Sequence, residues 1–234
     1  MSTIIEFKNV EKIYKSGEHV LKALDNVNFS INRGEFVVIL GPSGAGKSTL
    51  LNLLGGLDSV SSGEIIVDGK HIESFNDNQL TEYRAKNVGF IFQFYNLIPN
   101  LTAEENINLM EDVVNVKIDG LDILDFVGLK EHANNFPAQL SGGEQQRVSI
   151  ARAISKQPTM LLCDEPTGAL DSNTGVLILN LLQDLSNNQN TTIIIVTHNA
   201  LLANAADKVI RIKNGQVESI VINEFPMKIT DLEW

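Results

Sequence analysis

The hydrophobic and polar positions of this chain follow two spacings, which predict strands and helices in different regions. Short runs rich in β-branched and aromatic side chains predict strands at residues 4–7, 27–31, 36–40, 64–67 and 87–93. Residues 160–163 and 192–197 are continuous apolar runs, which are typical of strands buried on both faces of a parallel sheet. Residues 209–221 predict a hairpin that turns at Asn214 and Gly215.

Apolar residues at helical spacing, or polar helix-forming stretches, predict helices at residues 75–90, 101–140, 144–157 and 173–185. Pro158 ends the third of these helices. Antiparallel strands near both ends, with a parallel and helix-covered centre, predict an α/β domain. We therefore expect a single domain over residues 1–234, with a helical subdomain inserted at about residues 94–158.

The composition narrows the class of protein. With 43% apolar and 20% charged residues, the 234-residue chain is typical of a folded, soluble protein. Its net charge of −11 argues against nonspecific binding of nucleic acid, which needs a basic surface. The single cysteine excludes an internal disulfide framework, and neither a signal-peptide pattern nor a membrane-spanning apolar run is present in the sequence. We therefore expect a cytoplasmic protein without a nucleic-acid partner.

Residues 41–49 match the phosphate-loop pattern G-x-x-x-x-G-K-S/T, between a predicted strand and a helical run. Its glycines let backbone N–H groups converge on a phosphate, and the helix start adds partial positive charge. Lys47 is expected to reach the terminal phosphates, and the Ser48 hydroxyl is expected to bind Mg²⁺. The nucleotide-binding residues predicted here are Ser43, Gly44, Gly46, Lys47, Ser48 and Thr49.

Two carboxylates, Asp164 and Glu165, follow the apolar strand predicted at residues 160–163. A carboxylate at such a strand end holds Mg²⁺ in phosphate-loop NTPases, and Asp164 fits this role. Glu165 points differently, so we expect it to orient or deprotonate a water in line with the γ-phosphate.

Ser141 and Glu144 have the spacing of a helix capping box. Gly142 and Gly143 between them are unusual for a cap, because they weaken the first turn and expose backbone N–H groups. The hydroxyl, the free amides and the helix dipole together predict a second anion site. The capping and anion-binding interpretations are compatible.

In their order along the chain, these motifs resemble those of the nucleotide-binding subunit of an ABC transporter, over residues 4 to about 220. The Leu-Ser-Gly-Gly-Glu-Gln signature at residues 140–145 carries most of this resemblance. The resemblance implies an α/β P-loop NTPase fold of the ABC-ATPase type, with an antiparallel β subdomain and a helical subdomain. It also implies ATP and Mg²⁺ as ligands.

The resemblance also implies individual roles. Tyr14 is similar to the aromatic residue that stacks on adenine, and His198 to the residue that contacts the γ-phosphate. Gln93 is similar to the residue that touches Mg²⁺ and senses the membrane partner. The implied catalytic residues are Glu165, His198 and Gln93, and the implied Mg²⁺ ligands are Ser48, Gln93 and Asp164. The implied nucleotide contacts outside the phosphate loop are Tyr14, Ser141, Gly142, Gly143, Glu144 and Asp171.

Residues 92–106 and 166–172 resemble most the ATPases of macrolide export, lipoprotein release and antimicrobial-peptide export, such as MacB, LolD and FtsE. This resemblance implies export or extraction of a peptide, lipid, lipoprotein or drug by a separate, FtsX-like integral membrane permease, on the inner face of the cell membrane. Phe94 and a short helical stretch after Asn106 depart from the subgroup pattern, in the region expected to touch the permease.

One phosphate loop and one signature per chain imply a head-to-tail dimer that clamps two ATP–Mg²⁺ between its copies. One alternative is an FtsE-like regulatory ATPase that signals through a permease-like partner without transport. Another is a small-molecule kinase, which leaves the Ser-Gly-Gly-Glu element and His198 unexplained.

Overall fold

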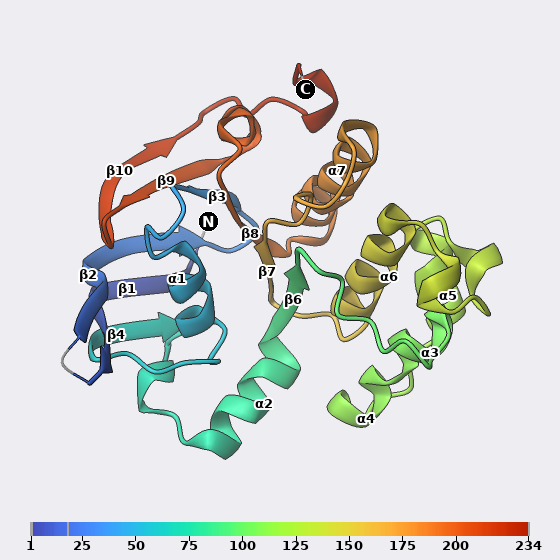
Figure 1. Cartoon of the computed structure of the whole chain (residues 1–234), viewed down its shortest axis with the longest axis horizontal. Coiled ribbons are helices and arrows are strands. Elements are labelled where there is room, and N and C mark those ends of the chain that lie inside the picture. Colours follow the sequence, from blue (N-terminus) through green and yellow to red (C-terminus); the bar gives the residue numbers. More distant parts are fainter. Residues whose placement is uncertain (1, 18, 234) are drawn as a thin grey trace.

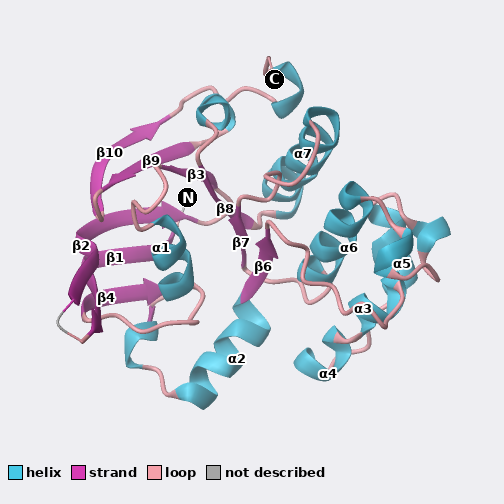
Figure 2. Cartoon of the chain, in the orientation of Figure 1, coloured by secondary structure: helices cyan, strands magenta, loops and turns pink. Residues whose placement is uncertain are grey.

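Two β-sheets form the centre of the chain, and helices cover them (Figures 1 and 2). The computed structural model describes residues 2–17 and 19–233. The antiparallel sheet, in the order β2-β1-β4-β5, contains β1 (Thr3–Ser16), β2 (His19–Asn32), β4 (Ser62–Val67) and β5 (Lys70–His71). The mixed sheet, in the order β10-β9-β3-β8-β7-β6, contains β3 (Phe36–Leu40), β6 (Val88–Phe92), β7 (Met160–Asp164), β8 (Thr192–Thr197), β9 (Lys208–Lys213) and β10 (Gln216–Ile222).

The centre of the mixed sheet is parallel, from β9 through β3, β8 and β7 to β6, and only β10 pairs antiparallel at its edge. All residues of β3 and β8 are buried, as are all of β7 except its last residue, Asp164. Helices or the second sheet cover both faces, which explains why these strands are continuous apolar runs. The predicted strands and the hairpin at Asn214 and Gly215 are confirmed.

The helices divide between the two sheets and a separate group at one end of the molecule (Figure 1). The α-helices are α1 (Lys47–Leu54), α2 (Asp77–Asn87), α3 (Ala103–Asn108), α4 (Met110–Val114), α5 (Gly120–Phe126), α6 (Gly142–Ile154) and α7 (Ser172–Gln189). Short 3₁₀ helices are η1 (Ile72–Ser74), η2 (Lys130–His132), η3 (Pro137–Gln139), η4 (Ala200–Ala205) and η5 (Ile229–Asp231). None of the described helices has the length and apolar composition needed to cross a bilayer.

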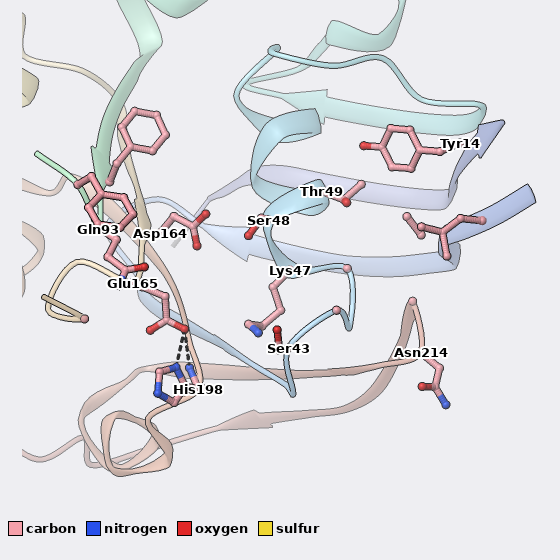
Figure 3. A pocket seen from close by; sticks show the side chains of 18 of the residues that line it. Tyr14, Ser43, Lys47, Ser48, Thr49, Gln93, Asp164, Glu165, His198 and Asn214 are labelled. Atoms are coloured by element: carbon pink, nitrogen blue, oxygen red, sulfur yellow. Dashed lines mark hydrogen bonds and ion pairs between the residues drawn. The ribbon is translucent and has the colours of Figure 1, made fainter. Parts of the chain in front are cut away.

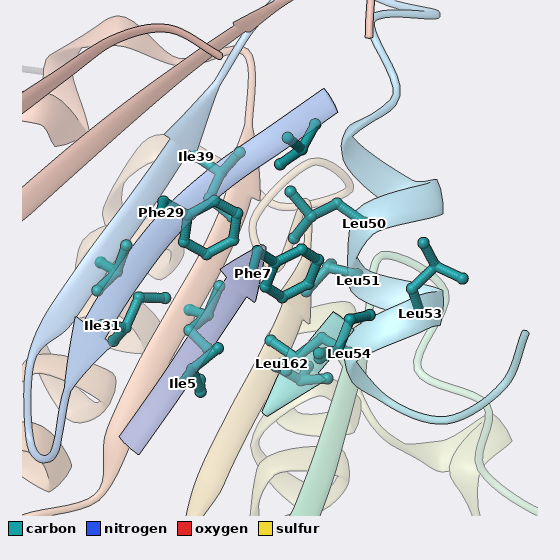
Figure 4. Close-up of a cluster of buried hydrophobic side chains, with 14 of the residues drawn as sticks. Ile5, Phe7, Phe29, Ile31, Ile39, Leu50, Leu51, Leu53, Leu54 and Leu162 are labelled. Carbon is teal, nitrogen blue, oxygen red and sulfur yellow. The ribbon is translucent and has the colours of Figure 1, made fainter. Parts of the chain in front are cut away.

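Two apolar cores hold the sheets to their helices. Between the sheets, α1 packs its leucines against both, and Phe7 stacks on Phe29 with ring centroids 4.5 Å apart (Figure 4). On the opposite face of the mixed sheet, α7 buries Ile178, Leu179 and Leu182. A third cluster joins α3, α5 and α6. The mixed sheet is therefore fixed from both faces, which keeps the loops at its edge in place.

Two regions differ from the sequence prediction. The strands predicted at residues 4–7 and 27–31 are parts of a long hairpin, β1 and β2, whose register shifts at several points. These irregularities, together with the exposed polar face, hide its length from the apolar pattern. The helical spacing over residues 101–140 breaks into short helices, since Asn115 and Gly128 are left-handed, with φ of 54° and 70°, and end the turns before them.

Candidate functional site

The carboxyl ends of β3, β6, β7 and β8 meet at one edge of the mixed sheet, where an open pocket of about 1250 Å³ lies (Figure 3). Parallel order explains this meeting, because each strand delivers its following loop to the same edge. The predicted site residues that line the pocket are Tyr14, Ser43, Gly44, Gly46, Lys47, Ser48, Thr49, Gln93, Asp164, Glu165 and His198.

The loop between β3 and α1 turns at left-handed glycines. Gly44 has a φ of 76° and Gly46 a φ of 103°. A Cβ on Gly46 would lie 2.4 Å from the carbonyl oxygen of Ala23, so both backbone and space require glycine there. Gly46 is also the N-cap of α1 and offers no side-chain hydrogen bond. The first N–H groups of α1 are thus available to an anion.

Lys47, the first residue of α1, is buried although it carries a charge. Its ammonium donates hydrogen bonds to the carbonyl oxygens of Gly41 and Pro42, at 2.9 and 3.0 Å. The backbone carbonyl groups of the loop therefore hold the Lys47 ammonium on the concave side of the loop. A phosphate bound against the loop would meet this ammonium as well as the helix N–H groups.

Asp164 ends β7 beside the start of α1. Burial raises the pKa of its carboxyl, and the charge of Glu165 adds to this, while a hydrogen bond from Ser48 and the charge of Lys47 oppose it. Gln93 lies on the same pocket wall, with its amide close to Gly168. Hydroxyl, carboxylate and amide oxygens are the donor set that Mg²⁺ prefers, so Ser48, Asp164 and Gln93 fit a magnesium site.

Glu165 adopts a left-handed backbone, with a φ of 47°, directly after β7. Its Oε2 accepts a hydrogen bond of 2.9 Å from the Thr197 hydroxyl. Its Oε1 accepts one of 3.1 Å from the His198 N–H and lies 2.8 Å from His198 Nδ1. Figure 3 shows this group on one side of the pocket and Tyr14, beside Thr49, on the other. The carboxylate is oriented on both of its oxygens.

The signature residues lie outside the pocket. The predicted capping box is confirmed: the Ser141 hydroxyl accepts from the Glu144 N–H at 3.3 Å, and Glu144 Oε2 accepts from the Ser141 N–H at 2.7 Å. The bonds that its carboxylate accepts from the Ser141 N–H and from the Ser141 hydroxyl lower the pKa of Glu144. Gly142 and Gly143 form the first turn of α6, and none of these four residues lines the pocket.

Asp171 also lies outside the pocket and caps α7, where hydrogen bonds from Thr174 lower its pKa. The starts of α6 and α7 are neighbours, because a Cβ on Gly143 would lie 2.2 Å from Thr174 Cγ2. Ser141 and Asp171 are both exposed. Two helix N-termini therefore open onto one exposed region, and their partial positive charges add.

Two residues that the sequence analysis did not single out, Gln146 and Thr197, hold elements of the site together. Gln146 of α6 is fully buried and donates from Nε2 to the carbonyl oxygens of Pro166 and Phe92, at 2.7 and 3.3 Å. Thr197 is buried and holds Glu165. For Thr197, its place as the last residue of a predicted strand, directly before His198, was an available signal. No pattern in the sequence marks Gln146, because its partners lie 54 and 20 positions away.

A sequence model of the ABC transporter family matches residues 24–168 of the chain. The chain is 46% identical over 225 residues to the uncharacterized ABC transporter ATP-binding protein MJ0796 of Methanocaldococcus jannaschii, covering 92% of this chain and 95% of that protein. Two dimeric structures of MJ0796 match with a TM-score of 0.87 at 42% and 44% identity, covering 95% of this chain and all of theirs. One of them is a post-hydrolysis state bound to ADP and Pi.

Some relatives are longer than this chain. It is 42% identical over 235 residues to the macrolide export ATP-binding/permease protein MacB of Photorhabdus laumondii, covering 98% of this chain and 36% of MacB. It is 45% identical over 236 residues to MG065 of Mycoplasma genitalium, covering 99% of this chain and 50% of MG065. The chain thus spans about half the length of the Mycoplasma relatives. The fold class and the resemblance predicted from the motifs are confirmed.

Proposed function

The chain belongs to the ABC transporter family, and from this premise we propose that it hydrolyses ATP to ADP and phosphate, with Mg²⁺, between two copies of itself. One observation carries the proposal. The phosphate loop, Asp164, Glu165 and His198 line one pocket, while the signature residues and Asp171 lie outside it at two helix starts, where Ser141 and Asp171 are exposed. Each copy thus offers one half of each of two sites, and a second copy is needed to complete them.

In this proposal, the nucleotide phosphates bind between the first N–H groups of α1 and the Lys47 ammonium. Ser48, Gln93 and Asp164 hold Mg²⁺, which neutralises charge on the phosphates. The raised pKa of Asp164 means that the protein alone stabilises its buried carboxylate charge poorly, so that a cation is favoured there. Tyr14 stacks on the adenine at the far side of the pocket.

Glu165 orients the attacking water and accepts its proton. The hydrogen bonds from Thr197 and His198 fix the carboxylate, so that no rotation is needed before the proton moves. His198, with its side chain 76% exposed, is free to contact the γ-phosphate through its other ring nitrogen. Gln93, as a ligand for the metal, couples binding of the nucleotide and Mg²⁺ to the surface proposed to contact the membrane partner.

The second copy completes the site. Its Ser141 hydroxyl and the N–H groups of Gly142 and Gly143 reach the γ-phosphate, beside Glu144, and its Asp171 crosses the interface. The neighbouring starts of α6 and α7 support this, because their combined dipoles favour an anion. The dimers of MJ0796 give further support. ATP is then the bridge between the copies, and its hydrolysis releases them.

We further propose an integral membrane permease as partner, of the FtsX-like type, which places the chain on the inner face of the cell membrane. MacB, whose name combines export, ATP binding and a permease, supports this. Phe94, which follows Gln93 and is 72% exposed, is available for such a contact. Export or extraction of a peptide, lipid, lipoprotein or drug is the proposed task, and FtsE-like regulation without transport is the alternative.

Light scattering of Glu165→Gln tests the clamp. With ATP and Mg²⁺ this variant is expected to bind nucleotide, to release no phosphate and to form a dimer. A monomer that retains bound ATP would contradict the clamp. Retained phosphate release would contradict the role of Glu165. Reconstitution with the permease that Glu165→Gln captures from detergent extracts then distinguishes transport from regulation, by whether a cargo moves with ATP.

A further inference from the structure

A partly buried ion pair, Lys12 with Asp58, contacts Tyr14, which lines the pocket. Lys12 is only 8% exposed, and its ammonium donates to Asp58 Oδ1 at 2.6 Å and to the Ser59 carbonyl oxygen at 2.7 Å. The Ser59 N–H donates to the same Oδ1 at 2.7 Å. Asp58 Oδ2 accepts a hydrogen bond of 2.8 Å from the Tyr14 hydroxyl. One carboxylate therefore joins the lysine, the loop and the tyrosine.

The same lysine also covers the tyrosine ring. Lys12 Nζ lies 4.9 Å from the centroid of the Tyr14 ring, over its face. Tyr14 lines the pocket, whereas Lys12 and Asp58 do not. Lys12 therefore holds the ring from one face, while the ring itself borders the pocket. Tyr14 is held at its hydroxyl and over one face of its ring.

Hydrogen bonds to the Asp58 carboxylate offset the effect of its burial. Burial alone would raise the pKa of Asp58, but the hydrogen bonds from Lys12 and Tyr14 outweigh it, so the pKa is lowered. Asp58 is therefore ionised throughout the neutral range and always able to accept the tyrosine hydrogen bond. By contrast, the pair of Arg33 and Asp68 at 2.6 Å is more exposed, with 34% and 54% of the side chains accessible, and among the described residues no third side chain hydrogen-bonds to it.

We infer that Asp58, fixed by Lys12, is a positioning residue that sets the Tyr14 ring for adenine. This inference rests on the proposed stacking of Tyr14 on the base. Without the tether, the ring would have to be ordered each time a nucleotide binds, and that ordering weakens binding. Asp58 then contributes to base recognition without touching the nucleotide.

The test compares two ligands, ATP and inorganic tripolyphosphate, by calorimetric titration. Both occupy the phosphate loop, and only ATP carries the base. Asp58→Ala and Tyr14→Phe are each expected to weaken ATP about 2- to 12-fold and to leave tripolyphosphate unchanged. The double variant is expected to lose no more than Asp58→Ala alone, because both changes remove the same hydrogen bond between Tyr14 and Asp58. Asp58→Asn, which keeps an oxygen acceptor, is expected to recover part of the loss.

Asp68→Asn is the matched control, and its ATP affinity is expected to be that of the unmodified chain. Additive losses in the double variant would overturn the inference, as would an equal loss for both ligands in Asp58→Ala or an unchanged ATP affinity in Tyr14→Phe. Tyr14→Ala separates this failure from failure of the stacking itself. If Tyr14→Ala binds ATP normally, the proposed adenine contact is wrong; if it weakens ATP while Asp58→Ala does not, only the positioning role is wrong.

Discussion

Thr197 and Glu165 are joined by a hydrogen bond of 2.9 Å between the last residue of β8 and the first residue after β7. The same hydroxyl accepts a bond of 3.1 Å from the Asn199 N–H. Thr197 therefore links the carboxylate proposed as the base to the loop that carries His198. A buried hydroxyl, together with the direct contacts between Glu165 and His198, fixes the relative position of two side chains, proposed as catalytic, that follow different strands.

Thr197→Val removes this hydroxyl and keeps the shape of the side chain. We expect kcat for ATP hydrolysis to fall about 10-fold with little change in KM, because the carboxylate loses one of its fixed bonds but the phosphate contacts remain. Steady-state phosphate release measures this. Thr192→Val, at the other end of β8, is the control. Its hydroxyl accepts from the Gly34 N–H at 3.0 Å, so it is expected to lower stability without lowering kcat. Equal kcat in both variants would contradict the positioning role.

Two capping boxes in the same group of helices allow an effect on stability to be distinguished from an effect on dimer formation. Ser141 with Glu144 caps α6, and Thr102 with Glu105 caps α3. Ser141→Ala and Thr102→Ala are each expected to lower the free energy of unfolding by about 1 kcal/mol in urea titrations. Only Ser141→Ala is expected to prevent the ATP-dependent dimer of the Glu165→Gln background, as measured by light scattering. Loss of the dimer in both variants would show a merely structural effect.

The phosphate-loop residues, Asp164 and Glu165 could be predicted because they lie in a dense motif or follow a recognisable apolar strand, whereas the roles of Tyr14, Gln93 and His198 were implied by the family resemblance. Asp164, for example, follows a run of four apolar residues, and the parallel sheet brings such strand ends together. The sequence also indicated the capping box at Ser141, since both of its bonds are local.

Contacts between distant segments could not be predicted in this way. The partners Lys12 and Asp58 are 46 positions apart, and Gln146 reaches a carbonyl 54 positions away. Such pairs depend on how the hairpin of β1 and β2 packs on α1, and how α6 packs on the mixed sheet. Hydrophobic periodicity and motif spacing do not predict how these elements pack, because each side chain involved is an isolated polar residue that belongs to no local pattern.

Two glycines of the phosphate loop should respond differently to a methyl group. Gly44 and Gly46 both have positive φ, so alanine is strained at either position. At Gly44 no atom of the described residues, apart from its own chain neighbours, lies within 4 Å of the added Cβ, and Gly44→Ala is expected to cost about 1–2 kcal/mol of unfolding free energy. At Gly46 the Ala23 backbone lies 2.4 Å away, so Gly46→Ala is expected to cost more. Urea unfolding measures both, and equal losses would contradict the close packing of β2 on the loop.

Asp164 gives a stability prediction with a defined sign. Its pKa is raised above 3.8, first by burial and then by Glu165, so its ionised form destabilises the folded chain relative to the unfolded one. That cost is absent below pH 3.8 and complete above the raised pKa. Asp164→Asn without nucleotide is therefore expected to melt higher than the unmodified chain at neutral pH, by about 2–4 °C for each kcal/mol gained. The gain should vanish as the pH falls through the raised pKa.

Asp171 provides the opposite trend in the same melting experiment. Its pKa is lowered, first by the side chain of Thr174 and then by its backbone, so the charged form stabilises the folded chain. Asp171→Ala is expected to melt lower at neutral pH, and its deficit should shrink as acid protonates the native carboxylate.

With Mg²⁺ and ATP, the advantage of Asp164→Asn should reverse, because only the carboxylate binds the ion strongly. If Asp164→Asn melts lower than the unmodified chain at neutral pH without ligand, burial does not dominate at this strand end.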